Sequence, residues 1–152
     1  MTPRQLFRTF AIAEVITWAG LIAALIIRGA GGWAGAVSVA GGIHGFVFLC
    51  YGVTTVFVWV NQRWSAGTGI LGLVSAIVPF ATVPFEIVQD RKGKLEGGWR
   101  LAPGGDAPRT WIEHIQAWVL KHPFLSIAIL LVLVVTAYVV LLQLGPPKLP
   151  GR

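Results

Sequence analysis

Residues 33–60 read WAGAVSVAGGIHGFVFLCYGVTTVFVWV, and this stretch decides the fold. It contains no Asp, Glu, Lys or Arg, and the polar turn Asn61-Gln62-Arg63 follows it. About 20 apolar residues in helical form are enough to cross the ~30 Å hydrocarbon core of a bilayer. The stretch therefore predicts a transmembrane helix, with His44 near its middle.

Three further apolar runs occupy residues 7–27, 66–88 and 124–144. The length of the first run, and Glu14 within it, favour a membrane helix over a cleavable signal peptide. The third run contains Pro79 and Pro84, which remove backbone donors and should kink or partly unwind its second half. We expect an all-α, polytopic membrane bundle of four transmembrane helices, with the first three packed as antiparallel neighbours.

The composition agrees with a lipid environment. Of the 152 residues, 55% are hydrophobic and 12% are charged, and the mean hydropathy is +0.74. Soluble domains carry roughly 25% charged residues, so an ordinary soluble enzyme and a disordered chain are both excluded. The net charge of +6 comes mostly from cations beside apolar runs, which indicates membrane edges and lipid headgroups rather than nucleic acid. The single cysteine, Cys50, permits no intrachain disulfide.

A polar stretch at residues 89–123 separates the third and fourth runs. Within it, Thr110 and Glu113 have the spacing of a helix capping box. Apolar residues then recur at helical spacing and include Trp111, Ile115 and Trp118. Because tryptophans concentrate at membrane interfaces, we expect an amphipathic helix lying in the interface. The alternative is a short solvent helix packed on a partner protein.

The chain thus divides into a three-helix membrane domain (1–90), a polar loop with the amphipathic helix (91–123) and a C-terminal transmembrane helix with its tail (124–152). Four crossings would place five cations on one side and seven on the other, a weak contrast for the positive-inside rule. We expect the 89–123 loop to be cytoplasmic, although Arg4 and Arg8 argue for the opposite orientation. The five are Arg4, Arg8, Arg63, Lys148 and Arg152; the seven are Arg28, Arg91, Lys92, Lys94, Arg100, Arg109 and Lys121.

Four polar residues inside the runs form a candidate buried polar site: Glu14, His44, Tyr51 and Glu86. Ionisable groups at membrane depth are costly and frequently mark function. A carboxylate facing an imidazole can share a proton or bind a cation. The competing interpretation is a structural hydrogen bond that fixes helix packing. No catalytic residue is assigned, and no metal site or other cofactor is expected, because metal-ligand spacings such as HExxH or CxxC are missing.

Small residues in the second run provide candidate helix-packing positions. Gly41 and Gly45 form a GxxxG pair, and Ala34, Ser38 and Gly42 form a second ridge beside it. Such residues allow helices to approach closely in membranes. Packing inside the bundle and contact with another chain are both compatible with this pattern.

Several of these residues together resemble a family of small bacterial integral membrane proteins, a YdzA-like three-helix domain of unknown function. The resemblance rests on Phe7-Arg8, Glu14, the stretch Gly41-Gly42-Ile43-His44-Gly45-Phe46-Val47-Phe48-Leu49-Cys50-Tyr51, Trp64 and Pro79-Phe80. It covers roughly residues 4–90 and leaves the loop and the fourth run outside. It implies a membrane fold in which Glu14 and His44 matter, but it implies no activity.

These observations favour a non-catalytic accessory or stabilising subunit of a larger complex in the bacterial cell membrane, with an energy-converting complex as one candidate host. Its expected partners are membrane lipids and other membrane subunits or further copies of the chain, and not nucleic acid. A small transporter or channel protomer that uses the Glu14–His44 site is the alternative. A membrane enzyme with His44 as acid/base has less support, since no catalytic motif is present.

Overall fold

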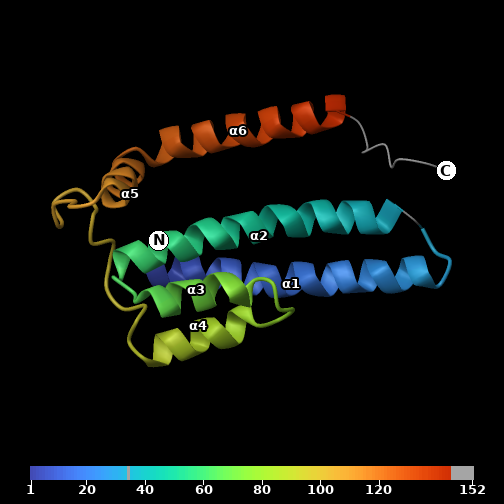
Figure 1. The fold of residues 1–152 in the computed structure, drawn as a ribbon, viewed down its shortest axis with the longest axis horizontal. Coiled ribbons are helices and arrows are strands. Elements are labelled where there is room, and N and C mark those ends of the chain that lie inside the picture. The colour runs from blue at the N-terminus through green and yellow to red at the C-terminus, as the bar shows by residue number, and fades with distance from the viewer. Residues whose placement is uncertain (34, 145–152) are drawn as a thin grey trace. The chain divides into compact units, whose positions relative to one another are not determined.

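The computed structural model describes residues 1–33 and 35–144, and they form an all-α structure (Figure 1). The helices are α1 (Pro3–Gly29), α2 (Gly35–Asn61), α3 (Ala66–Ser75), α4 (Thr82–Arg91), α5 (Trp111–Lys121) and α6 (Pro123–Leu144). They belong to two compact units, Met1–Arg100 and Leu101–Arg152.

Helices α1 and α2 form an antiparallel pair that is the centre of the first unit (Figure 1). Thr2 and Gln5 form a capping box that starts α1, with Pro3 in its first turn. Each helix has 27 residues and is long and apolar enough to cross a membrane. Only 17% and 28% of their most apolar windows are buried. The core helix of a soluble protein would be mostly buried, so the low burial favours lipid contact.

The third apolar run does not form the single spanning helix expected over residues 66–88. Helices α3 and α4 have ten residues each, roughly 15 Å of rise. They are separated by an irregular segment at residues 76–81, where Pro79 lies. The partial unwinding expected from the prolines is therefore confirmed, but the third crossing is not observed. Among the residues that the structure describes, α1 and α2 are the two helices long and apolar enough to span a membrane, so four spans are not shown.

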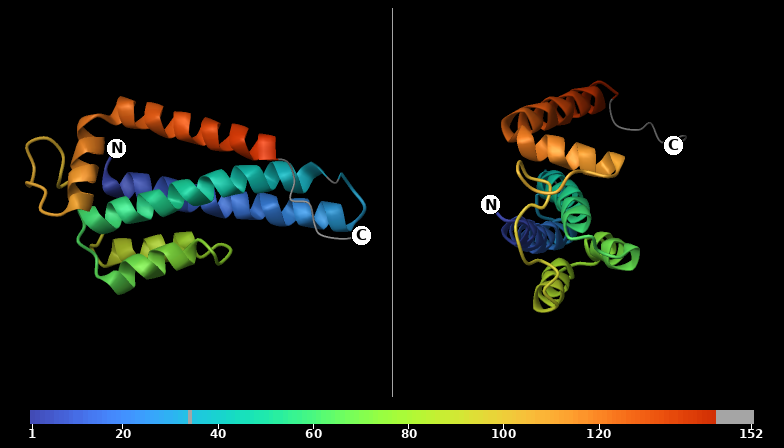
Figure 2. Two further views of the ribbon diagram at one scale, coloured as in Figure 1. Left: turned by 45° about the horizontal axis from the view of Figure 1, so that its top comes forward. Right: turned by 90° about the vertical axis from the view of Figure 1, so that its left-hand side faces the viewer.

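Contacts show that α3 and α4 form a helical hairpin that packs against α1 and α2. Along α3, Gly69 contacts Trp59, and further along Ser75 bonds with Tyr51. The chain then turns, and α4 runs back along α1. The hydroxyl of Thr82 donates to the Ala11 carbonyl at 2.9 Å, and Glu86 and Asp90 reach Arg8 and Arg4. The hairpin thus enters and leaves at the same end of the α1–α2 pair, as the left view of Figure 2 shows.

The core of the first unit is aromatic. The ring of Phe7 packs 5.5 Å from Tyr51, 5.7 Å from Trp64 and 6.1 Å from Phe85, measured between centroids. The last two pairs have edge-to-face geometry, a favourable arrangement for aromatic quadrupoles. These rings come from α1, α2, the turn after α2, and α4, so the cluster joins the hairpin to the long helices.

The hairpin also changes the expected distribution of charge. Arg91 to Arg100 were expected on the membrane side opposite Arg63, but Arg100 donates to the backbone of Asn61 and Lys94 donates to Thr68. They therefore lie at the end of the unit where α1 begins and α2 finishes. We call this the charged end; its cations are Arg4, Arg8, Arg63, Arg91, Lys92, Lys94 and Arg100. Arg28, the remaining Lys or Arg of this unit, lies at the opposite end.

The second unit contains the predicted amphipathic helix and the fourth apolar run. The capping box of Thr110 and Glu113 is confirmed at the start of α5. The fourth run forms α6, a 22-residue helix. Its membrane crossing stays a prediction, and the tail, with Lys148 and Arg152, lies outside the described residues.

The close packing of α3 on α2 predicts a clear difference between two glycines of the same helix. A Cβ at Gly69 would overlap the Trp59 ring, whereas a Cβ at Gly67 would meet nothing within 4 Å. We expect Gly69→Ala to lower the free energy of unfolding by about 1–3 kcal/mol. Gly67→Ala, the matched control, should be neutral or slightly stabilising because Ala favours helix. Thermal unfolding in detergent measures both, and equal melting temperatures would contradict the packing.

Candidate functional site

Glu14 is the most unusual polar residue of the first unit. Its side chain is fully buried on α1. Neither carboxyl oxygen makes a hydrogen bond with any described residue. Burying a carboxylate without hydrogen bonds or a close counter-charge costs several kcal/mol, on the order of the penalties seen for isolated buried ions. The geometry therefore favours a neutral, protonated Glu14 or a carboxylate that gains a partner in the working protein.

His44 of α2 lies next to Glu14, as the sequence pattern suggested. The distance from its Nδ1 to Glu14 Oε2 is 3.8 Å, and that from Nδ1 to Thr17 Oγ1 is 3.1 Å. The Thr17 hydroxyl donates its single proton to the Glu14 backbone carbonyl. Nδ1 must therefore be the donor in its contact with Thr17, and it carries a proton. The Trp18 ring packs over the imidazole, with centroids 4.5 Å apart.

Tyr51 lies further along α2 towards the charged end. Its side chain is fully buried and bonds with α3. Its hydroxyl lies 2.9 Å from Ser75 Oγ, and Ser75 donates to the Gly72 carbonyl at 2.6 Å. Because a serine hydroxyl has one proton, Tyr51 donates to Ser75. Its polar group is therefore occupied in holding α3 on α2.

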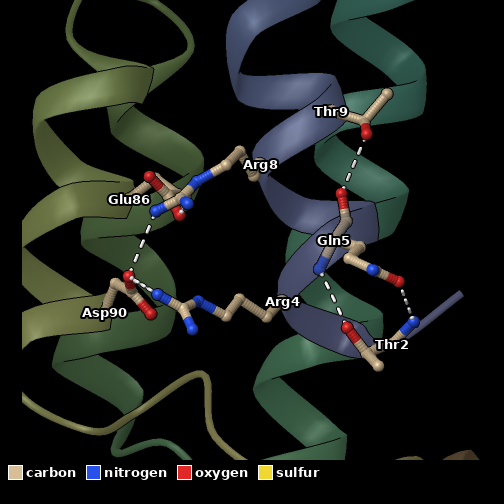
Figure 3. Close-up of polar contacts among 7 residues, drawn as sticks. All are labelled: Thr2, Arg4, Gln5, Arg8, Thr9, Glu86 and Asp90. Atoms are coloured by element: carbon tan, nitrogen blue, oxygen red, sulfur yellow. Dashed lines mark hydrogen bonds and ion pairs between the residues drawn. The ribbon is translucent and has the colours of Figure 1, made fainter.

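Glu86 belongs to a different cluster from Glu14 and His44. It is almost fully buried on α4, and its Oε1 accepts from Arg8 Nε at 2.9 Å. Arg8 donates to Asp90 as well, and Arg4 donates to Asp90. Two arginines of α1 therefore face two carboxylates of α4 (Figure 3). The sequence pattern singled out Glu86 but did not identify these partners. The structure thus separates the four predicted residues into the Glu14–His44 pair, the Tyr51–Ser75 contact and this ion-pair network.

Two hydrogen bonds join the helix break to α1, one to a backbone carbonyl of the break and one from a side chain beside it. Trp18 Nε1 donates to the Ala76 carbonyl at 3.2 Å, and Thr82 donates to the Ala11 carbonyl at 2.9 Å. Sequence reasoning missed Trp18, Ser75 and Thr82 as members of the site. The prolines indicated a break, and residues facing such a break must satisfy its freed backbone groups.

The site can hold protons, but the described residues offer no metal centre. No group of three or more His, Cys, Asp or Glu side chains converges among them. A lone Glu–His pair supplies too few ligands for a closed zinc site. Chemically, the arrangement provides one buried acid beside one imidazole in apolar surroundings.

The small residues of α2 do not pack as closely within the chain as GxxxG motifs can. A Cβ at Gly42 or Gly45 would meet nothing within 4 Å, and one at Gly41 would only touch Leu21 at 4.0 Å. Ser38 and Gly42 are exposed, and Gly41 and Gly45 are partly exposed, so these four residues form an open ridge. In the second unit, α5 exposes Trp111, Ile115 and Trp118, while Glu113 and Gln116 are buried. The interfacial role of this helix stays a prediction.

Comparison with known proteins places the first unit in a family. The family model described as "Domain of unknown function (DUF3817)" matches residues 4–91. The "Putative membrane protein SCO5905" of Streptomyces coelicolor is 37% identical over 91 residues, which is 59% of this chain and 11% of that relative. The chain therefore matches about a tenth of the relative's length. No solved structure matches it.

The expected likeness to a family of unknown function is confirmed, and the matching relative is named a putative membrane protein. The more specific YdzA-like assignment stays a prediction. The family match extends from the first turn of α1 to the end of α4 and covers more than half of the chain. The chain belongs to the DUF3817 family.

Proposed function

We propose that this protein is a multi-pass protein of the bacterial cell membrane and an accessory or stabilising subunit of a larger membrane assembly. The observation that carries the proposal is the open ridge of Ser38, Gly41, Gly42 and Gly45. It lies on a helix long enough to span a membrane, yet no residue that the structure describes comes within 4 Å of a Cβ placed at Gly42 or Gly45. Small-residue ridges of this kind allow another transmembrane helix to approach closely.

The polar contacts support the same proposal. The side chains of Tyr51, Thr82, Arg8 and Glu86 bond within the first unit, and so they stabilise the hairpin and leave the ridge for a partner. Large apolar side chains, including Ile43, Phe46 and Leu49, are exposed beside the ridge. Apolar surface of this extent on a membrane helix suits lipid or another apolar helix.

The charge distribution supports an orientation. Short loops rich in Lys and Arg remain in the cytoplasm. The charged end holds seven such residues, and the opposite end of the unit holds Arg28. The proposal therefore places the charged end in the cytoplasm. The 89–123 loop begins there, in agreement with the orientation expected from the sequence.

Substitution on the ridge tests the proposal. Gly42→Leu fills the ridge, and Gly20→Leu adds the same side chain on α1, where a Cβ also meets nothing within 4 Å. After gentle detergent extraction, size analysis and mass spectrometry should find the wild type and Gly20→Leu with a stoichiometric partner chain. Gly42→Leu should lose that chain while keeping its melting temperature, because the added side chain clashes only with the partner.

A monomeric wild-type chain, or a partner that remains bound to Gly42→Leu, would contradict the accessory role. A partner that proves to be a further copy of the chain would weaken it and favour the second candidate.

That second candidate is a proton-carrying transporter protomer, and Glu14 is the observation that favours it. A buried acid without a hydrogen bond, 3.8 Å from an imidazole nitrogen, can take up and release a proton. Glu14→Gln keeps the shape and removes the titration, so its melting temperature should match that of the wild type. Proton flux into proteoliposomes, followed with a pH-sensitive dye, should fall to the protein-free level.

The control for the flux measurement is Asp106→Asn, which removes an exposed carboxylate of the polar loop outside both the Glu14–His44 pair and the charged end. Its flux should equal that of the wild type. Undiminished flux in Glu14→Gln, or no flux above protein-free vesicles in the wild type, would eliminate the transporter candidate.

A further inference from the structure

A pocket of about 470 Å³ opens at the charged end, beside the first turns of α1. Its walls come from α1 and from the segment that follows α4. Figure 3 shows the α1 side, with the arginines reaching α4 beside the capped start of the helix. The lining residues are Thr2, Arg4, Gln5, Arg8, Leu95, Glu96 and Gly97.

The level of the pocket along α1 matches that of lipid headgroups, an argument that depends on the proposed membrane insertion. Apart from Glu14, the residues of α1 from Thr9 to Ile27 are uncharged and largely apolar. Two tryptophans lie at this end and donate to the backbone there: Trp64 to the Lys94 carbonyl at 2.9 Å, and Trp99 to the Met1 carbonyl at 2.8 Å. Trp residues beside cations are typical of the membrane–water interface.

The pocket carries charges of both signs on different walls. The side chains of Arg4 and Arg8 are 50% and 44% exposed, although each donates to a carboxylate of α4. Arginine has five N–H donors, so each retains donors for a ligand. Glu96 contributes an exposed carboxylate from the opposite wall.

The balance of these charges selects the ligand. Glu86 and Asp90 already offset the charges of the two arginines, and Glu96 adds a further negative charge. A ligand with only negative charge would gain from the arginines and be repelled by the Glu96 carboxylate. A zwitterion can place its phosphate on the arginines and its ammonium on Glu96, so that both contacts are favourable.

We propose that this pocket binds a phosphate ester that carries a primary ammonium group, and specifically the headgroup of phosphatidylethanolamine. The phosphate lies against Arg4 and Arg8, and the ammonium lies against Glu96. Leu95, which is fully buried beneath this wall, gives the segment a fixed position. A soluble molecule of the same chemistry, phosphoethanolamine, is the other source of such a ligand.

Lipid titration of the purified full chain, followed by native mass spectrometry, tests the proposal. Phosphatidylethanolamine should bind more tightly than phosphatidylglycerol, whose headgroup lacks the ammonium. Arg4→Gln should weaken phosphatidylethanolamine binding roughly fivefold, the size expected for one exposed charged contact of about 1 kcal/mol. Glu96→Gln should reverse the preference towards phosphatidylglycerol, because it removes the ammonium partner and the repulsion of anions.

Arg28→Gln, at the far end of α1, is the matched control and should bind phosphatidylethanolamine like the wild type. Arg8 is left unchanged, since its loss would strand the buried Glu86 carboxylate. Equal binding of the two lipids, or a preference that Glu96→Gln does not alter, would overturn the proposal. Preferential binding of soluble phosphoethanolamine over the lipid would overturn the lipid as the source.

Alkaline extraction of membranes that contain the chain tests membrane insertion separately from the headgroup pocket. A chain that resists extraction but shows no headgroup preference contradicts the pocket alone. A chain released by alkali contradicts the insertion on which the pocket proposal rests.

Discussion

The structure of the first unit depends on satisfying the backbone of a broken helix among apolar side chains. Residues 76–81 leave the helical hydrogen-bonding pattern, and unpaired peptide groups are costly where water is excluded. Trp18 supplies a donor to the Ala76 carbonyl, and the hydroxyl of Thr82, the first residue of α4, bonds to the Ala11 carbonyl. Both partners lie on α1. The long helix is therefore the support on which the break is held.

The direction of the chain after the break determines where the charged residues of the first unit meet. Because α4 returns along α1, Glu86 and Asp90 meet Arg8 and Arg4 (Figure 3). The same return brings the cations that follow α4 to the end where α1 starts. The proposed cytoplasmic orientation and the proposed headgroup pocket both follow from this arrangement. Neither would arise if residues 66–88 crossed to the opposite end.

The sequence predicted the parts of this structure that depend on local pattern. The all-α class, the two long apolar helices, the break near Pro79 and the capping box at Thr110 follow from hydropathy, helical periodicity and the properties of proline. Glu14 and His44 stood out because each is an isolated polar group in an apolar run, and the structure places their side chains 3.8 Å apart. The return of α4 was missed because hydropathy measures apolar length and carries no information on chain direction.

Other features depend on contacts between residues far apart in the sequence. Arg8 lies at the start of the first apolar run, but its carboxylate partners are 78 and 82 positions away in the sequence. Gly69 has other glycines near it in the sequence, at positions 67 and 72, as Gly41 has at 42 and 45. Of Gly69 and Gly41, it is Gly69 that lies against a large ring. Whether a glycine faces a neighbouring helix or an open surface depends on helix rotation, which small-residue spacing alone does not determine.

Thermal unfolding of Trp18→Phe in detergent tests the central role of the helix break most directly. The substitution keeps an aromatic ring beside His44 and removes the donor to the Ala76 carbonyl. We expect it to lower the free energy of unfolding by about 1–3 kcal/mol, the cost of leaving one buried carbonyl unpaired. Trp33→Phe, an exposed tryptophan at the far end of the helix pair, is the control and should be neutral. Equal stability of the two variants would contradict the account.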